Sequence, residues 1–136
     1  KRVRHTMNPV IVTRNGEPFL ICGTPGADTQ VQTALQLLTH IIDFGMTPQE
    51  AVEAPRWRSL QNPMESTVPH TCENLLQLEG RFAAEVRQGL AQRGHELQIL
   101  GPWEGPGSAQ AILIDPASKA LIGGSDPRRD GYAIGW

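Results

Sequence analysis

Two short apolar runs separated by Asn15-Gly16 are the feature that most constrains the fold of this chain. Residues 9–13 and 19–22 are rich in β-branched and other apolar side chains. An Asn-Gly pair between two such runs is typical of a β-hairpin with a two-residue turn, because both turn positions need a positive φ. The sequence therefore predicts an antiparallel hairpin near the start of the chain.

A Gly-rich turn at residues 23–28 joins this hairpin to a helical pattern. Apolar side chains recur at helical spacing over residues 31–42, and Gly45 is typical of a helix end. Asp28 and Thr29 are both residue types that cap a helix N-terminus. We expect a sharp strand-to-helix turn here, followed by one long helix.

The rest of the chain alternates short helix and strand patterns. Thr47, Pro48 and Glu50 form a capping box with Pro at the first helical position, and this short helix ends before Pro55. We expect irregular structure with short strands at residues 57–69, and a third helix from Phe82 to Gly94. Further strands are expected at residues 74–78, 95–100, 109–114 and 121–122. A Gly-rich charged tail follows from residue 123. About six or seven strands and three helices in this mixed order indicate an α+β layered sandwich, not a Rossmann alternation.

The composition excludes several function classes. The 136 residues suit one domain, and 12 basic against 14 acidic side chains give a net charge of −2. This balance argues against nucleic acid or an anionic membrane as partner, and no apolar run approaches the roughly 20 residues of a membrane span. Cys22 and Cys72 are expected as buried thiols, and the scattered histidines predict no metal site. Because the chain begins at Lys1, we expect a processed product or part of a longer gene product.

Two segments carry candidate chemistry. The turn at residues 23–28 leaves backbone N–H groups that can bind an anion or a developing oxyanion, although many such turns are only sharp corners. Lacking a Gly-Lys-Ser/Thr run, it is not a P-loop. Residues 125–130 could form either a catalytic carboxylate cluster or an Asp–Arg network that holds a Pro turn. We favour the structural network. For Arg56 an interior salt bridge is favoured over a contact with a substrate carboxylate.

Taken together and in this order, six segments resemble the small, C-terminal subunit of γ-glutamyltranspeptidases. They are Met7-Asn8-Pro9, Gly23-Thr24-Pro25-Gly26, residues 43–46 (DFGM), residues 51–56 (AVEAPR), Gly94-His95 and residues 124–128 (GSDPR). The resemblance runs from Lys1 to the end of the chain and implies the αββα sandwich of an N-terminal-nucleophile hydrolase, built from two autoproteolytic fragments. In this family a Thr at the start of the small subunit attacks a γ-glutamyl amide, its own α-amine serves as base, and the acyl group passes to water or an amino acid.

The resemblance also assigns candidate site residues. Gly26 and Ala27 fall where the family has its Gly-Gly oxyanion hole, and Ala27 can still donate its N–H if its φ and ψ are allowed. His5 and Thr6 fall where typical members have a Ser-Ser pair that holds the substrate carboxylate. Asp28 stands where typical members lack an acid. His5, Ala27 and Asp28 therefore suit a divergent branch acting on another acyl amide, with no cofactor or metal.

The family's nucleophilic Thr and the strand after it would precede Lys1. We therefore expect residues 1–136 to be the C-terminal portion of the small subunit, inactive alone, with the large subunit and the rest of the small subunit as partners. Isolated, this portion would leave sheet edges and apolar surface uncovered, which also leaves pairing with a second copy open. The resemblance implies a periplasmic or secreted location, while the residues leave a cytoplasmic one open. Two other interpretations stay open: a non-catalytic subunit or binding module that kept the fold, and a cephalosporin- or glutaryl-acylase-like amidase with the same mechanism.

Overall fold

The computed structural model describes residues 6–60 and 74–135, which fall into two compact units. The first unit takes residues 1–54 and 107–136, and the second takes residues 55–106. His5, Cys72 and most of the segment expected to be irregular, residues 61–69, lie outside the described residues.

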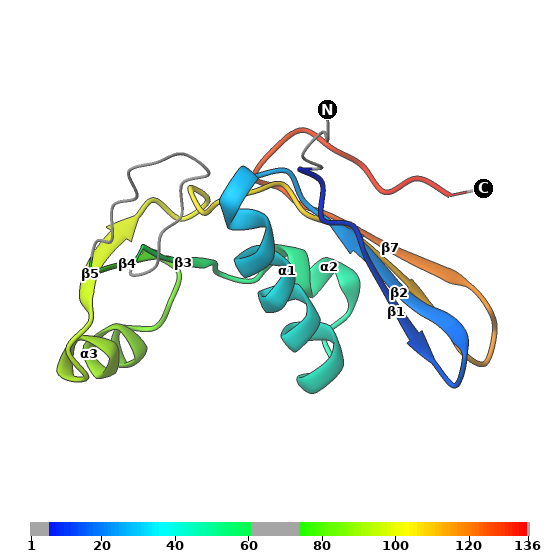
Figure 1. The fold of residues 1–136 in the computed structure, drawn as a ribbon, viewed down its shortest axis with the longest axis horizontal. Helices are drawn as coiled ribbons and strands as arrows, with labels where there is room; N and C mark the ends of the chain where they lie inside the picture. Colours follow the sequence, from blue (N-terminus) through cyan, green and yellow to red (C-terminus); the bar gives the residue numbers. More distant parts are fainter. Residues whose placement is uncertain (1–5, 61–73, 136) are drawn as a thin grey trace, which may run out of the picture. The chain divides into compact units, whose positions relative to one another are not determined.

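A four-stranded antiparallel sheet forms the frame of the first unit (Figure 1). Asn15 and Gly16, with φ of 53° and 83°, turn the chain between its first two strands, so the predicted hairpin is confirmed. The strand order is β1-β2-β6-β7, with β1 at Val10–Arg14, β2 at Glu17–Gly23, β6 at Gln110–Ile114 and β7 at Leu121–Ser125. The central β2–β6 pair thus joins segments far apart in the sequence.

The helices of this unit lie on one side of the sheet (Figure 1). The long helix expected after the turn is divided into a 3₁₀ turn η1 at Ala27–Thr29, α1 at Gln30–Leu38 and a π-helical turn η2 at Thr39–Asp43. The short helix α2 at Pro48–Glu53 begins with the predicted capping box. Bonds from the Thr47 backbone N–H and hydroxyl lower the pKa of the Glu50 carboxyl.

The core lies between α1, α2 and the inner face of the sheet. Leu20 and Cys22 point inward from β2 and meet apolar side chains of both helices, such as Leu37 and Val52. Cys22 is only 4% exposed, which confirms one of the two expected buried cysteines, and this burial raises the pKa of its thiol. Within the described residues, no helix is long and apolar enough to span a bilayer.

The last strand is longer than expected, because two glycines of the presumed tail belong to it. A Cβ at Gly124 would lie 2.5 Å from the Pro48 carbonyl carbon, so only Gly lets the start of α2 rest on β7. The Gln49 side chain closes the same contact, since its amide donates to the Ser125 carbonyl and accepts from the Ser125 N–H. The Gly-rich stretch therefore serves close packing of a helix on a strand.

The outer face of the sheet is apolar and exposed. Ile11, Ile21 and Ile112 stand in one row across three strands, with 66%, 40% and 41% of their surface exposed. This row confirms the expected uncovered apolar surface in the described part of the first unit.

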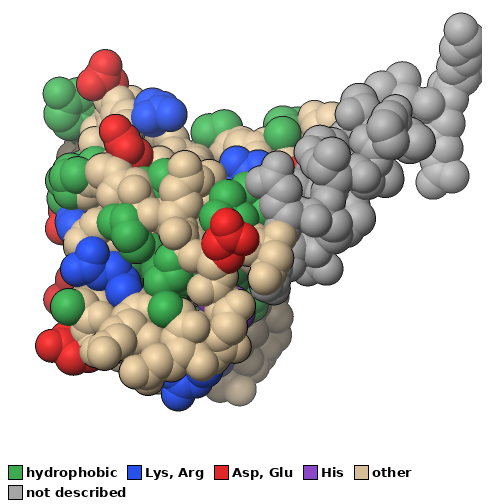
Figure 2. Space-filling model, turned by 90° about the vertical axis from the view of Figure 1, so that its left-hand side faces the viewer, with side chains coloured by type: hydrophobic (Ala, Val, Ile, Leu, Met, Phe, Trp, Pro, Cys, Tyr) green, Lys and Arg blue, Asp and Glu red, His purple; other side chains and the backbone are tan. Residues whose placement is uncertain are grey.

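The described part of the second unit is a three-stranded sheet with one helix. The strands β3 (Trp57–Ser59) and β4 (Leu75–Glu79) are antiparallel, whereas β4 and β5 (Glu96–Leu100) are parallel. Helix α3 (Ala84–Gln92) provides the crossover between the parallel strands, and it begins two residues later than the expected Phe82. On the face drawn in Figure 2, basic and acidic side chains are interspersed with apolar ones, consistent with the near-balanced charge.

We predict that Gly124→Ala strongly destabilises the protein. The added Cβ would force α2 off β7, which costs on the order of 1–3 kcal/mol or more. The melting temperature of the variant should fall by several degrees, while Gly23→Ala, a strand glycine with open space around its Cβ position, serves as control. Equal melting temperatures for the two variants would contradict the close approach.

Candidate functional site

The turn after β2 has an unusual backbone. Gly26 has a φ of 144° and Ala27 a φ of 47°, so both residues lie where L-amino acids with side chains are rarely found. A Cβ at Gly26 would also collide with the Thr29 hydroxyl, so the position requires Gly. Ala27 adopts the left-handed conformation despite its Cβ, which indicates that the surrounding contacts hold the turn in this shape.

Thr29 fixes the orientation of the peptide between Gly26 and Ala27. The Gly26 carbonyl accepts two hydrogen bonds, from the Thr29 N–H at 2.9 Å and from the Thr29 hydroxyl at 2.7 Å. In a trans peptide the C=O and the following N–H point in opposite directions. The Ala27 N–H is therefore directed away from Thr29, and within the described residues neither it nor the Gly26 N–H donates to a protein acceptor.

The sequence predicts Thr29 as a possible helix cap, whereas in the structure it holds the Gly26 carbonyl. No side-chain cap bond is formed at the start of α1, because Thr29 has helical φ and ψ of −82° and −11° where a capping residue is normally extended. Its hydroxyl donates to the Gly26 carbonyl instead. On the other side of the turn, the Thr24 Oγ1 accepts from the Ser108 N–H at 3.1 Å. Gly107 has a φ of +86°, and a Cβ there would collide with Thr24. The turn is thus held at both ends.

A groove of about 920 Å³ lies beside the turn and brings several of the predicted site residues together. Thr6, Gly26 and Ala27 all line it, whereas Asp28 is half-buried and is not among the described lining residues. His5 lies outside the described residues, so only Thr6 of that pair is placed. The other lining residues are Met7, Asn8, Pro9, Gly23, Thr24, Pro25, Gln30, Ser108 and Gln110.

The groove offers hydrogen-bond donors in a neutral setting. None of the described residues that line it has a titratable side chain. Elsewhere in the described ranges, no group of three or more His, Cys, Asp or Glu side chains could hold a metal ion. The arrangement can therefore stabilise a developing negative charge through oriented backbone N–H groups.

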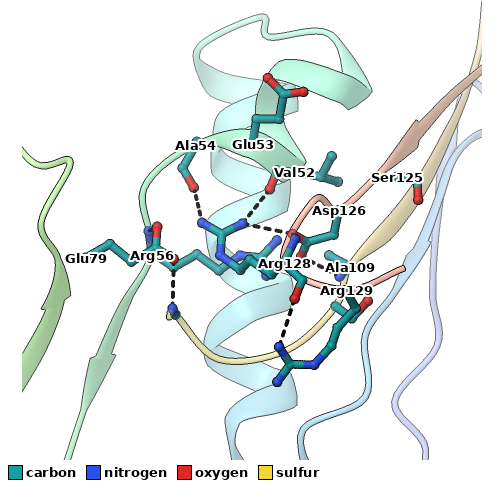
Figure 3. A network of polar contacts seen from close by, with 12 residues as sticks. Val52, Glu53, Ala54, Arg56, Glu79, Ala109, Ser125, Asp126, Arg128 and Arg129 are labelled. Atoms are coloured by element: carbon teal, nitrogen blue, oxygen red, sulfur yellow. Dashed lines mark hydrogen bonds and ion pairs between the residues drawn. The ribbon is translucent and has the colours of Figure 1, made fainter. Parts of the chain in front are cut away.

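The Asp–Arg cluster near the end of the chain is a structural network, as favoured from the sequence (Figure 3). Arg128 and Asp126 are joined by a 3.0 Å ion pair and both side chains are fully buried. Arg128 also donates to the carbonyls of Val52 and Ala54, each at 2.8 Å, at the C-terminus of α2. Asp126 accepts the Ala109 N–H at 2.8 Å just before β6. One ion pair thus ties α2 to the ends of β6 and β7.

A second buried network occupies the second unit. The Arg56 side chain is buried and donates to the Pro106 carbonyl at 3.0 Å. Sequence reasoning missed Glu79, whose buried carboxylate accepts the N–H groups of Arg56 and Gly105 and a bond from Arg81 at 2.8 Å. The only sequence signal for a buried Glu79 is its position at the end of the apolar strand β4, and an acid in that position is ordinarily expected to face solvent.

Comparison with known proteins identifies relatives of this chain. The family described as gamma-glutamyltranspeptidase matches the chain over residues 1–136. The chain is 34% identical to cephalosporin acylase from Bacillus halodurans, with a TM-score of 0.80 over 94% of this chain and 22% of that one. It is 29% identical to the γ-glutamyltranspeptidase of Pseudomonas nitroreducens, with a TM-score of 0.76 over 100% of this chain and 65% of that one.

The curated relatives of this chain point to the same family. The glutathione hydrolase-like YwrD proenzyme of Bacillus subtilis is 37% identical over 99% of this chain, and the oxamate amidohydrolase proenzyme of Klebsiella pneumoniae is 34% identical over 100% of it. In both cases the chain spans 25% of the relative's length. The fold is thus part of an N-terminal-nucleophile hydrolase sandwich. The chain belongs to the γ-glutamyltranspeptidase family, a family of enzymes made as proenzymes.

We predict that Arg128→Met costs about 3–5 kcal/mol of folding stability, because it leaves the Asp126 carboxylate buried without its cation. Arg128→Lys should cost less, since it keeps the charge but cannot reach all three acceptors. Urea unfolding of the full-length protein measures the effect, with the exposed Arg93→Met as control. A loss no larger than that of the control would contradict the network's role.

Proposed function

We propose that this chain supplies the oxyanion hole and part of the substrate site of an amidohydrolase or acyltransferase that cleaves γ-glutamyl or related acyl amides. The observation that carries the proposal is the locked Gly26–Ala27 peptide, whose N–H is directed away from its tethered carbonyl beside a groove. The family membership supports the reaction class. On this view residues 1–136 form the C-terminal portion of the small subunit.

The reaction would need a nucleophile from another part of the precursor, an N-terminal Thr. Its hydroxyl oxygen forms a bond to the amide carbon, its α-amine takes the proton, and the carbonyl oxygen becomes an oxyanion. The N–H groups of Gly26 and Ala27 donate to that oxyanion. When the C–N bond breaks, the proton passes to the leaving amine, and water or an amino acid then releases the acyl group from the Thr.

Thr6 is the proposed contact for a carboxylate on the acyl group. Thr6 lines the same groove as the two proposed oxyanion donors, and its hydroxyl can donate one hydrogen bond to a carboxylate oxygen. His5 and Asp28 stay proposed members of the substrate site on the basis of sequence position. The relatives reported above are named for different reactions, such as oxamate amidohydrolase and cephalosporin acylase, so the proposed substrate class includes both γ-glutamyl and other acyl amides.

The remaining parts of the precursor are the proposed partners. The row formed by Ile11, Ile21 and Ile112 would lie under the second sheet of the αββα sandwich. Removing three such side chains from water supplies several kcal/mol toward assembly, at about 25 cal/mol per Å². We therefore propose large-subunit and small-subunit segments of the same precursor, in preference to a second copy, as the cover.

A second candidate function is a non-catalytic subunit or binding module. Ala27 supports it, because a side chain at a φ of 47° carries a conformational cost that a glycine would not. Against it, the two bonds from Thr29 keep the donor peptide in the orientation that an oxyanion hole needs.

Mass spectrometry of the purified full-length precursor under denaturing conditions separates the two candidates. We expect two chains, with the smaller one beginning at a Thr upstream of Lys1, together with hydrolysis of a chromogenic γ-glutamyl or glutaryl anilide. A single unprocessed chain without amide hydrolysis would favour the binding module.

We predict that Gly26→Ala lowers kcat of the processed enzyme by roughly 10²–10³-fold, the usual loss when an oxyanion donor is displaced. The new Cβ would collide with the Thr29 hydroxyl and rotate the donor peptide. Gly16→Ala is the matched control, because it also has a positive φ but stands at the hairpin tip with open space around it. If the two variants had the same kcat, the oxyanion assignment would be wrong.

A further inference from the structure

Gln30 is a buried polar side chain at the start of α1, and no motif in the sequence singles it out. Only 8% of its surface is exposed. It follows directly after Thr29, whose bonds fix the oxyanion turn. Burying an amide costs free energy unless both its donor and its acceptor are satisfied, so its partners explain why it is there.

Both ends of the Gln30 amide bond to the segment that carries Thr6. The Nε2–H donates to the Thr6 carbonyl at 2.9 Å, and the Oε1 accepts from the Asn8 N–H at 3.2 Å. In an extended segment the C=O of one residue and the N–H two residues later lie on the same edge. The amide therefore bonds to residues 6–8 as a neighbouring β-strand would.

We propose that Gln30 is a positioning residue that sets the separation between the Thr6 hydroxyl and the oxyanion donors. This inference rests on the proposed function. Gln30 belongs to the same short stretch as Ala27 and Thr29, so its backbone is fixed relative to the donor peptide. Its side chain then fixes the backbone of Thr6. One amide thus links the contact for the acyl carboxylate to the contact for the reacting carbonyl.

The two positioning roles are separate, and this gives a kinetic signature. Thr29 holds the Gly26–Ala27 peptide without help from Gln30, so loss of the Gln30 amide leaves the oxyanion donors in place. What changes is the fit of a substrate whose carboxylate must reach Thr6. The loss should therefore appear in KM, with kcat almost unchanged.

The test is a double-mutant cycle in the processed full-length enzyme, with γ-glutamyl and glutaryl anilides as probes. Gln30→Met keeps the side-chain length and removes both bonds, and Thr6→Val removes the hydroxyl. Each single change should raise KM by about tenfold, of the order of one lost hydrogen bond, with kcat within about threefold of the parent. The double variant should match Thr6→Val alone, because Gln30 acts through Thr6. Gln88→Met, at an exposed position of α3, should leave both constants unchanged.

Hydrogen exchange at the Asn8 amide adds a readout that does not depend on activity. Gln30→Met should speed exchange at Asn8 and leave the Thr29 amide protected. Faster exchange with an unchanged KM would overturn the inference, since the contact would then be structural only, and so would multiplicative KM effects in the double variant. A parent enzyme that cleaves neither anilide would instead overturn the proposed function, and the inference with it.

Discussion

The planarity of a single peptide unit governs the candidate site. Because C=O and N–H of a trans peptide point in opposite directions, fixing one fixes the other. Two bonds from Thr29 to the Gly26 carbonyl consequently orient the Ala27 N–H without any contact to that N–H itself. The site is therefore built before a ligand arrives, as electrostatic stabilisation of a transition state requires.

Local signals in the sequence predicted most elements, because those elements depend on residues close together in the chain. The Asn15-Gly16 hairpin and the Thr47–Glu50 capping box both formed where expected. The extent of β7 was missed, because the strand role of Gly124 depends on Pro48, far away in sequence. Propensity alone predicts a loop at such a glycine, and only its contact with Pro48 explains its place in a strand.

The candidate site was predicted through resemblance, and its supporting side chains were not. Gly26, Ala27 and Thr6 came from matching motif positions, and they do line one groove. The role of Gln30 could not be foreseen, since Thr6 and Asn8 become its neighbours only in the folded chain. Thr29 was singled out, but for a different role. Residue type suggested a helix cap for Thr29, but Thr29 has helical φ and ψ, and its hydroxyl donates to the Gly26 carbonyl instead.

The division of the chain into a split unit and an inserted one bears on how the protein is made. The second unit is contiguous, whereas the first needs residues from both sides of it. Arg128 reaches the Val52 carbonyl across 76 residues of sequence, and β6 must arrive before β2 has its second neighbour. During synthesis on a ribosome, the inserted unit can fold early, while the sheet that carries the Gly26–Ala27 turn stays incomplete until β7 emerges. This chain's share of the candidate site therefore cannot form until β7 has been translated.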